Sequence, residues 1–257
     1  MDLDKDRIAI LLYGEYRTFD VVNTFWDFKE NQNIDFYFST WNFSYQGNDE
    51  LNIHHKEKIT TNSFTKYFKQ NIPFLNIMDL ETEMSAFNCT HEKYIKYDEK
   101  GVPIHLRHLL EMMDMTSYDY IVLTRPDVFF NLSNAHKFTL KEDEIGVNSP
   151  LPTQLDNQPY AQIDIIHDLF FYGRGNIMHE FIRKAKNYNQ WGHECIKDFY
   201  ISKTFKFKEV ILDSVIVRPN CRNVDNLTLT EIRRLGYEFN KEKSNFQIQK
   251  HFLKKLI

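Results

Sequence analysis

Two charged residues end the most strand-like segment of the chain. Residues 119–130 read DYIVLTRPDVFF, so an apolar run is followed by Arg125, Pro126 and Asp127. Side chains alternate between the faces of a strand, and the spacing predicts that Arg125 and Asp127 project to the same side. A carboxylate there can bind a divalent cation, and a guanidinium can hold a phosphate through two parallel hydrogen bonds. A salt bridge between the two side chains is the alternative, and the spacing alone favours neither.

Two earlier segments end in residues that suit phosphate binding. RIAILLYG (7–14) ends in Gly14, and Arg17 follows just before a predicted helix. Glycine lets a ligand approach the backbone closely, and Arg17 together with the helix N-terminus could hold a diphosphate. An ordinary strand–helix turn with a surface arginine is the alternative. IDFYFSTW (34–41) places the hydroxyl of Thr40 at a second strand end.

The elements that must position these residues alternate between strand and helix. Strands over 7–14 and 34–41 with a helix over 19–31 between them predict a parallel sheet with a right-handed crossover. Ligands of open parallel sheets bind beyond the carboxyl ends of the strands, where Gly14 and Asp127 are expected. Further strands are predicted over 74–80, 119–130, 145–149, 168–173 and 209–219. Further helices are predicted over 64–72, 103–117, 176–189, 192–205 and the tail after 225. Residues 42–62 are predicted to form a polar surface loop.

Composition excludes several classes of protein. The 257 residues, 42% hydrophobic and 26% charged, indicate one large globular domain. A net charge of −4 argues against nucleic acid binding. The three cysteines form no C-x-x-C pair, and neither a signal peptide nor a membrane-spanning stretch is visible, so we expect free thiols and a cytoplasmic location. Phosphate-loop, dinucleotide-binding, zinc-protease and serine-hydrolase motifs are all missing from the sequence.

In order and spacing, these segments resemble a group of bacterial and viral GT-A type glycosyltransferases of polysaccharide (lipopolysaccharide and capsule) synthesis. LLYGEYR resembles the G-x-x-R opening of the group, and LTRPD stands where other GT-A enzymes carry a metal-binding Asp-x-Asp. HDLFFYGRGNIMHEF (167–181), GHECIKDFY (192–200) and VIVRP (215–219) resemble its later segments. The resemblance spans residues 7–219.

The resemblance implies a fold and a set of substrates. It implies a GT-A-like α/β domain over 1–225, with a mostly parallel Rossmann-like sheet flanked by helices. The nucleotide-sugar half would cover about 1–130 and the acceptor half about 131–225, and residues 226–257 would form a helical extension. The implied activity transfers a sugar from a nucleotide-sugar donor to a glycan or lipid-linked acceptor in surface polysaccharide synthesis.

The resemblance also assigns roles around the donor. Gly14, Arg17, Thr40 and Arg107 would line the nucleotide and its phosphates. Asp127 would bind a divalent cation, Mn²⁺ or Mg²⁺, or would act with Arg125 in its place. This chain departs from Asp-x-Asp because Arg125 occupies the first acidic position. A cation there can itself neutralise a leaving diphosphate, so metal dependence is an open alternative.

An inverting transferase needs a carboxylate that takes the proton from the attacking hydroxyl. Asp168 and Glu194 are the candidates, with Asp164 as a third. Asp168 is preferred because it opens a predicted strand beside the acceptor region, whereas a helix-borne glutamate such as Glu194 is more often a surface or capping residue. Two other functions are compatible with the sequence: a sugar-phosphate nucleotidyltransferase, and a non-catalytic nucleotide- or glycan-binding module.

Overall fold

The computed structural model describes most of the predicted domain. The described residues are 1–16, 19–23, 26, 28–48, 53–79, 82–83, 102–130, 132, 139–148, 170–187, 193–210, 214–216, 237–240 and 247–250. Only the backbone is described at 21, 45–48, 53–57, 129, 193–194, 214–216, 237–240 and 247–250.

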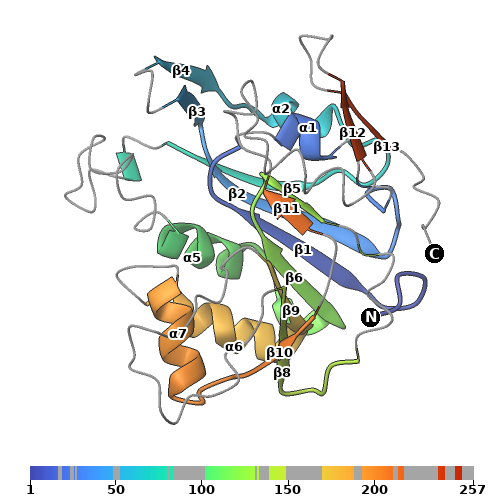
Figure 1. Ribbon diagram of the computed structural model, residues 1–257, viewed down its shortest axis with the longest axis vertical. Coiled ribbons are helices and arrows are strands. Elements are labelled where there is room, and N and C mark those ends of the chain that lie inside the picture. The colour runs from blue at the N-terminus through green and yellow to red at the C-terminus, as the bar shows by residue number, and fades with distance from the viewer. Residues whose placement is uncertain are drawn as a thin grey trace.

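A seven-stranded, mostly parallel sheet forms the centre of the molecule (Figure 1). Its strand order is β10-β8-β9-β6-β1-β2-β5. The strands are β1 (Ile8–Tyr13), β2 (Ile34–Trp41), β5 (Phe74–Met78), β6 (Tyr120–Thr124), β8 (Glu144–Val147), β9 (Phe170–Arg174) and β10 (Lys206–Glu209). Neighbours pair in parallel except at β9, which runs antiparallel to both β6 and β8. The predicted α/β class with a mostly parallel sheet flanked by helices is confirmed.

Helices cover both faces of this sheet. α1 (Phe19–Val22) and α2 (Thr61–Thr65) pack on one face, and α5 (Val102–Met112), α6 (Gly175–Ala185) and α7 (His193–Ile201) pack on the other. Alternate residues of β1 therefore enter different clusters: Ile8, Ile10 and Leu12 join the α1 side, and Ala9, Leu11 and Tyr13 join the α5 side. Burial on both faces explains why the strand is a continuous apolar run.

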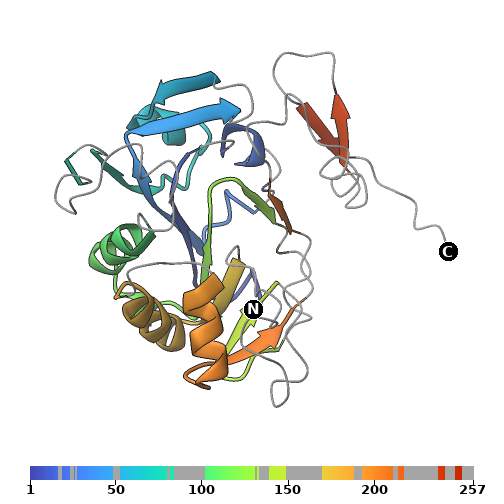
Figure 2. The same ribbon diagram turned by 60° about the vertical axis from the view of Figure 1, so that its left-hand side comes forward.

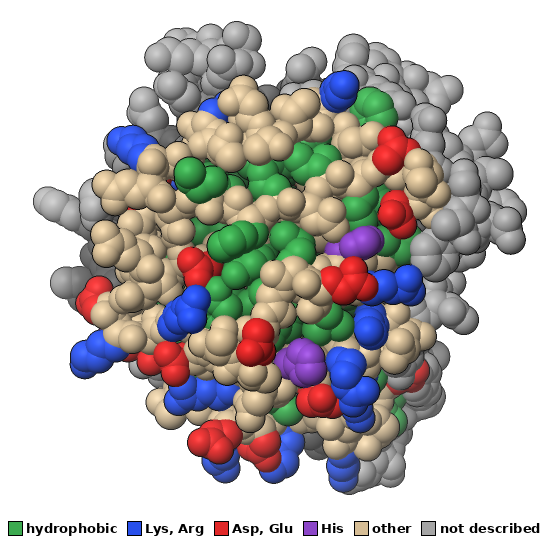
Figure 3. Space-filling view, turned by 180° about the vertical axis from the view of Figure 1, so that it is seen from behind, with side chains coloured by type: hydrophobic (Ala, Val, Ile, Leu, Met, Phe, Trp, Pro, Cys, Tyr) green, Lys and Arg blue, Asp and Glu red, His purple; other side chains and the backbone are tan. Residues whose placement is uncertain are grey.

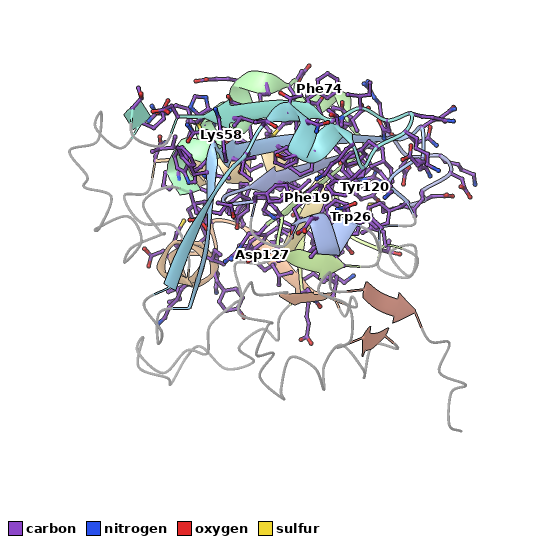
Figure 4. All side chains as sticks on the ribbon, turned by 90° about the horizontal axis from the view of Figure 1, so that it is seen from above. Phe19, Trp26, Lys58, Phe74, Tyr120 and Asp127 are labelled. Atoms are coloured by element: carbon purple, nitrogen blue, oxygen red, sulfur yellow. The ribbon has the colours of Figure 1, made fainter. Side chains whose placement is uncertain are left out.

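Rings dominate the cluster on the α1 side. Phe19 contacts Phe38 edge-to-face with 5.1 Å between ring centroids, and Trp26 stacks on Phe36 at 5.9 Å. Each such pair adds about 0.5–1.5 kcal/mol beyond the area that it buries. Figure 4 shows Phe19 and Trp26 inside the molecule, so the short helix α1 is fixed by its aromatic contacts rather than by its length.

Three two-stranded sheets complete the described strands. β3 (Phe43–Asn48) pairs with β4 (Ile53–Lys58), β7 (Val128–Phe130) with β11 (Ser214–Ile216), and β12 (Tyr237–Asn240) with β13 (Gln247–Lys250). The predicted surface loop over 42–62 was therefore wrong, because the backbone there forms a hairpin. The helix expected in the tail was wrong over the eight residues of β12 and β13, whose hairpin lies apart from the central sheet (Figure 2).

The described surface carries few large apolar side chains. The exposed large hydrophobics of the described residues are Ile72, which precedes the edge strand β5, and Phe74, the first residue of that strand. The back of the molecule shows hydrophobic side chains near its centre, with charged side chains to their sides and below them (Figure 3). Within the described residues, no helix combines the length and the apolar character needed to cross a membrane.

Candidate active site at the carboxyl edge of the sheet

The parallel strands β1, β2, β5 and β6 end together at one side of the sheet, which we call the carboxyl edge. Tyr13 of β1 pairs with Ser39 of β2, and Leu12 of β1 pairs with Thr124 of β6. Adjacent strands lie about 4.8 Å apart, so residues that follow these pairs are neighbours. Gly14, Thr40 and Arg125 are therefore brought to one edge, as the sequence predicted.

Gly14 begins a turn that leaves the end of β1. Its φ is +100°, a backbone conformation that side chains disfavour, so glycine is required there. Its N–H donates to the carbonyl oxygen of Ser39 with an N···O distance of 3.1 Å. A Cβ added to Gly14 would meet no atom of the described residues within 4 Å, so these residues leave the space beside this backbone open to a ligand.

Tyr16 anchors the other side of this turn. Its hydroxyl donates to the carbonyl oxygen of Ser63 at 3.1 Å, and its buried ring contacts those of Phe19 and Phe64 with centroids 5.4 and 5.1 Å apart. The N–H of Phe19 in turn donates to the carbonyl oxygen of Tyr16 at 2.9 Å. We call residues 14–16 the Gly14 turn; the predicted ligand Arg17 follows it but lies outside the described residues.

Arg125 and Asp127 form a bidentate ion pair directly after β6. Nε of Arg125 donates to Oδ1 of Asp127 at 3.0 Å, and Nη2 donates to Oδ2 at 2.7 Å. The side chain of Asp127 is 1% exposed and that of Arg125 is 16% exposed. A turn makes this contact possible, because the N–H of Val128 donates to the carbonyl oxygen of Arg125 at 3.2 Å around Pro126.

The single strand predicted over 119–130 is therefore two strands, β6 and β7, separated by a turn. The turn, rather than side-chain alternation along a strand, brings Arg125 to Asp127. Of the two interpretations of this pair, the salt bridge is the one that the structure shows. It employs both carboxylate oxygens of Asp127, and the described residues include no group of three or more His, Cys, Asp or Glu placed to hold a metal ion.

Polar groups of β2 lie at the same edge, beside the Gly14 turn. Thr40 is fully buried, and its Oγ1 has no hydrogen-bond partner among the described residues. A buried hydroxyl without a partner costs free energy, so a ligand that bonded to it would gain affinity. On the opposite face, Ser39 Oγ lies 3.1 Å from Nδ1 of His105, a residue that the sequence analysis missed.

The remaining predicted site residues stay predictions. Arg107 is exposed on α5, two residues beyond His105. Glu194 lies in the first turn of α7, where only the backbone is described. Asp164 and Asp168 are also outside the described residues. The Arg125–Asp127 pair stands well apart from the exposed Phe74, as the labelled positions of Asp127 and Phe74 show (Figure 4).

Comparison with known proteins finds likenesses among solved structures. No protein family matches the chain, and no curated protein matches it. Among solved structures, the apo-form glycosyltransferase GlyE of Streptococcus pneumoniae TIGR4 aligns with a TM-score of 0.40 and 8% sequence identity. The alignment covers 79% of this chain and 45% of that one, so the chain spans less than half the length of GlyE. A likeness this distant supports no argument about activity.

Proposed function

We propose that the chain is a glycosyltransferase that uses a nucleotide-sugar donor and a hydroxyl acceptor of a glycan. The observation that carries this proposal is the meeting, at one sheet edge, of an oriented guanidinium with an open glycine turn. Arg125 supplies fixed positive charge, and Gly14 supplies backbone that a phosphate can approach. The resemblance of the sequence to polysaccharide glycosyltransferases supports the same reaction.

Arg125 would act on the leaving group. In the reaction, the acceptor oxygen forms a bond to the anomeric carbon while the bond from that carbon to the nucleoside diphosphate breaks. The electron pair goes to the diphosphate, so negative charge grows there in the transition state. A cation already fixed in place stabilises this charge without reorganisation, and Asp127 fixes Arg125 through two hydrogen bonds.

The acceptor proton needs a carboxylate base. Asp168 remains the preferred candidate and Glu194 the second, on the resemblance alone. General-base catalysis contributes about 10²–10⁴-fold to such reactions. Replacing Asp168 by Asn is therefore expected to lower turnover within that range while donor binding persists; near-wild-type turnover would remove Asp168 from this role.

A divalent cation at Asp127 would share the carboxylate with Arg125. Each oxygen accepts one hydrogen bond from Arg125, so a metal ion would have to use the remaining lone pairs or displace the guanidinium. A cation held by the donor phosphates would supply the same charge stabilisation as Arg125 does. We therefore assign the diphosphate to Arg125, and treat Asp127 as a metal ligand only if binding proves to depend on both Asp127 and Mn²⁺.

The test is a calorimetric titration with UDP-, GDP- and CMP-linked sugars, each with and without Mn²⁺. Wild type is compared with Arg125→Met and Asp127→Asn. Arg183→Met is the matched control, because Arg183 also binds a carboxylate through Nε and Nη2, that of Glu180, but on the exposed surface of α6. We expect Arg125→Met to weaken donor binding at least tenfold, about the effect of one charge-assisted hydrogen bond, and Arg183→Met to leave it unchanged.

Product analysis separates the alternatives. A transferase releases nucleoside diphosphate, or monophosphate from a CMP-linked donor, when acceptor or water attacks the donor sugar. A nucleotidyltransferase instead consumes nucleoside triphosphate and releases pyrophosphate. A binding module releases neither. Absence of binding to all of the donors would overturn the proposal.

A further inference from the structure

We propose that His105 is a positioning residue that holds the Gly14 turn in the conformation that receives the donor phosphates. The identity of the ligand rests on the proposed function, whereas the contacts that link His105 to the turn are observed in the structure. It links α5, the end of β2 and the turn after β1, three segments that are distant in sequence.

The first link is a buried contact between α5 and β2. His105 lies in the first turn of α5 and is 1% exposed. Its Nδ1 lies 3.1 Å from Oγ of Ser39, which is fully buried. The ring of Trp41 packs against the imidazole with centroids 4.4 Å apart. The hydrogen bond to Ser39 and the ring contact with Trp41 together fix the orientation of the imidazole, with Nδ1 toward Ser39.

The second link runs from β2 to the turn. The carbonyl oxygen of Ser39 accepts the N–H of Gly14 at 3.1 Å. The same residue therefore contacts His105 with its side chain and Gly14 with its backbone. Glycine has more conformational freedom than any other residue, so a glycine turn keeps one conformation only if its neighbours hold it. Tyr16 holds the far side of the Gly14 turn, and Ser39 holds the near side.

An ordinary buried histidine would fill space without affecting ligand affinity. The opposite edge of the sheet offers a direct comparison, because a similar buried hydrogen bond links β2 to a residue outside the sheet there. The hydroxyls of Tyr37 and Tyr118 lie 2.9 Å apart, and that of Tyr118 donates to Asp35 at 2.6 Å. Removing this bond loosens β2 at the edge that lacks the site. Tyr118→Phe is therefore a matched control for loss of polar contacts on the same strand.

The experiment measures the turn directly and through its ligand. The variants are His105→Leu, which removes the ring nitrogens, Ser39→Ala, which removes their partner, and His105→Asn, whose amide can replace Nδ1. Hydrogen–deuterium exchange at the Gly14 amide reports the turn without any ligand. Calorimetry with whichever UDP-, GDP- or CMP-linked sugar binds wild type reports affinity.

We expect His105→Leu and Ser39→Ala to speed exchange at Gly14 and to weaken donor binding, each about tenfold, the effect of one buried hydrogen bond. His105→Asn should restore both to within about threefold of wild type. Tyr118→Phe should lower the thermal midpoint but change neither measurement. Ser39→Ala keeps the test decisive if the leucine variant does not fold.

Unchanged exchange at Gly14 in both removal variants would overturn the inference. So would an equal loss of donor affinity in Tyr118→Phe, since that would show general loosening of β2. A wild-type chain that binds no donor overturns the proposed function and the donor half of this inference. Exchange at Gly14 then still decides whether His105 holds the turn.

Discussion

The two members of the Arg125–Asp127 pair should not be equally costly to remove. Arg125→Met leaves the carboxylate of Asp127, which is 1% exposed, without the two hydrogen bonds that it accepts from Arg125. Removing one partner from a buried pair costs about 3–5 kcal/mol, because the remaining charge stays desolvated. Asp127→Asn leaves a guanidinium that is 16% exposed, and the amide oxygen can still accept one bond. We expect this change to cost about 1–2 kcal/mol.

Urea unfolding of wild type, the two single variants and the double variant measures this asymmetry. For a chain of this size, a cost of about 3 kcal/mol also lowers the thermal midpoint by about 6–12 °C. The double variant should be more stable than the sum of the single effects predicts, because it removes both charges of the pair together. The exposed pair of Arg183 and Glu180 provides the control cycle, with an expected coupling of about 0–1 kcal/mol.

Two outcomes would refute this reasoning. Arg125→Met could prove no more destabilising than Asp127→Asn, which would mean that burial of the carboxylate carries no penalty. Alternatively, the two effects could simply add, which would mean that the contact contributes nothing to the folded state. Either result would also remove the physical basis for assigning Arg125 an orientation imposed by Asp127.

Three further predictions concern single groups. Gly14→Ala should cost about 1–2 kcal/mol through its positive φ and not through a clash, and it should weaken donor binding; an unchanged unfolding curve would contradict it. Tyr172→Phe should leave the free energy of unfolding equal or higher, because the hydroxyl is buried with no hydrogen-bond partner among the described residues. Tyr118→Phe should instead lower it by about 1–2 kcal/mol, because that hydroxyl makes two hydrogen bonds; denaturation curves of the two variants test both predictions. Burial raises the pKa of the Cys195 thiol to about 12 from an ordinary value of 9.0. Native protein should therefore resist alkylation of Cys195 at pH 8, which peptide mapping with and without urea checks. As the pH rises above 9, ionisation of this thiol in the unfolded chain should lower the free energy of unfolding.

Burial decided which elements the sequence could predict. β1 is recognisable because a strand covered on both faces is almost entirely apolar, and β2 because five of its eight residues are apolar. The β3–β4 hairpin was missed because its residues are mostly polar and its strands are held by backbone pairing, which leaves little trace in composition. The break between β6 and β7 was missed although Pro126 marks it, since proline also occurs at strand ends.

Within the candidate site, sequence patterns predicted positions along strands but not contacts between them. Gly14, Thr40 and Arg125 were placed correctly because parallel strands bring their carboxyl ends to one edge. His105 and Ser39 are 66 residues apart in the sequence. The spacing of apolar residues over 103–117 predicts a helix there but says nothing of what His105 contacts. The sequence offers one signal for His105, namely a polar residue near the beginning of the helix that precedes β6. That signal does not identify Ser39 as its partner.

The buried position of Asp127 bears on what the ion pair is for. A buried ion pair is weak evidence for stability, because the free-energy cost of desolvating both charges offsets most of the favourable free energy of their attraction. An apolar pair of similar volume can be equally stable. Stability alone therefore does not explain a carboxylate that is 1% exposed at the end of β6. Orientation does, because two parallel hydrogen bonds restrict a long side chain to one direction. Under the proposed function, a guanidinium fixed in this way beside the Gly14 turn would need no rearrangement when a diphosphate binds, and stabilisation of a leaving group demands that property.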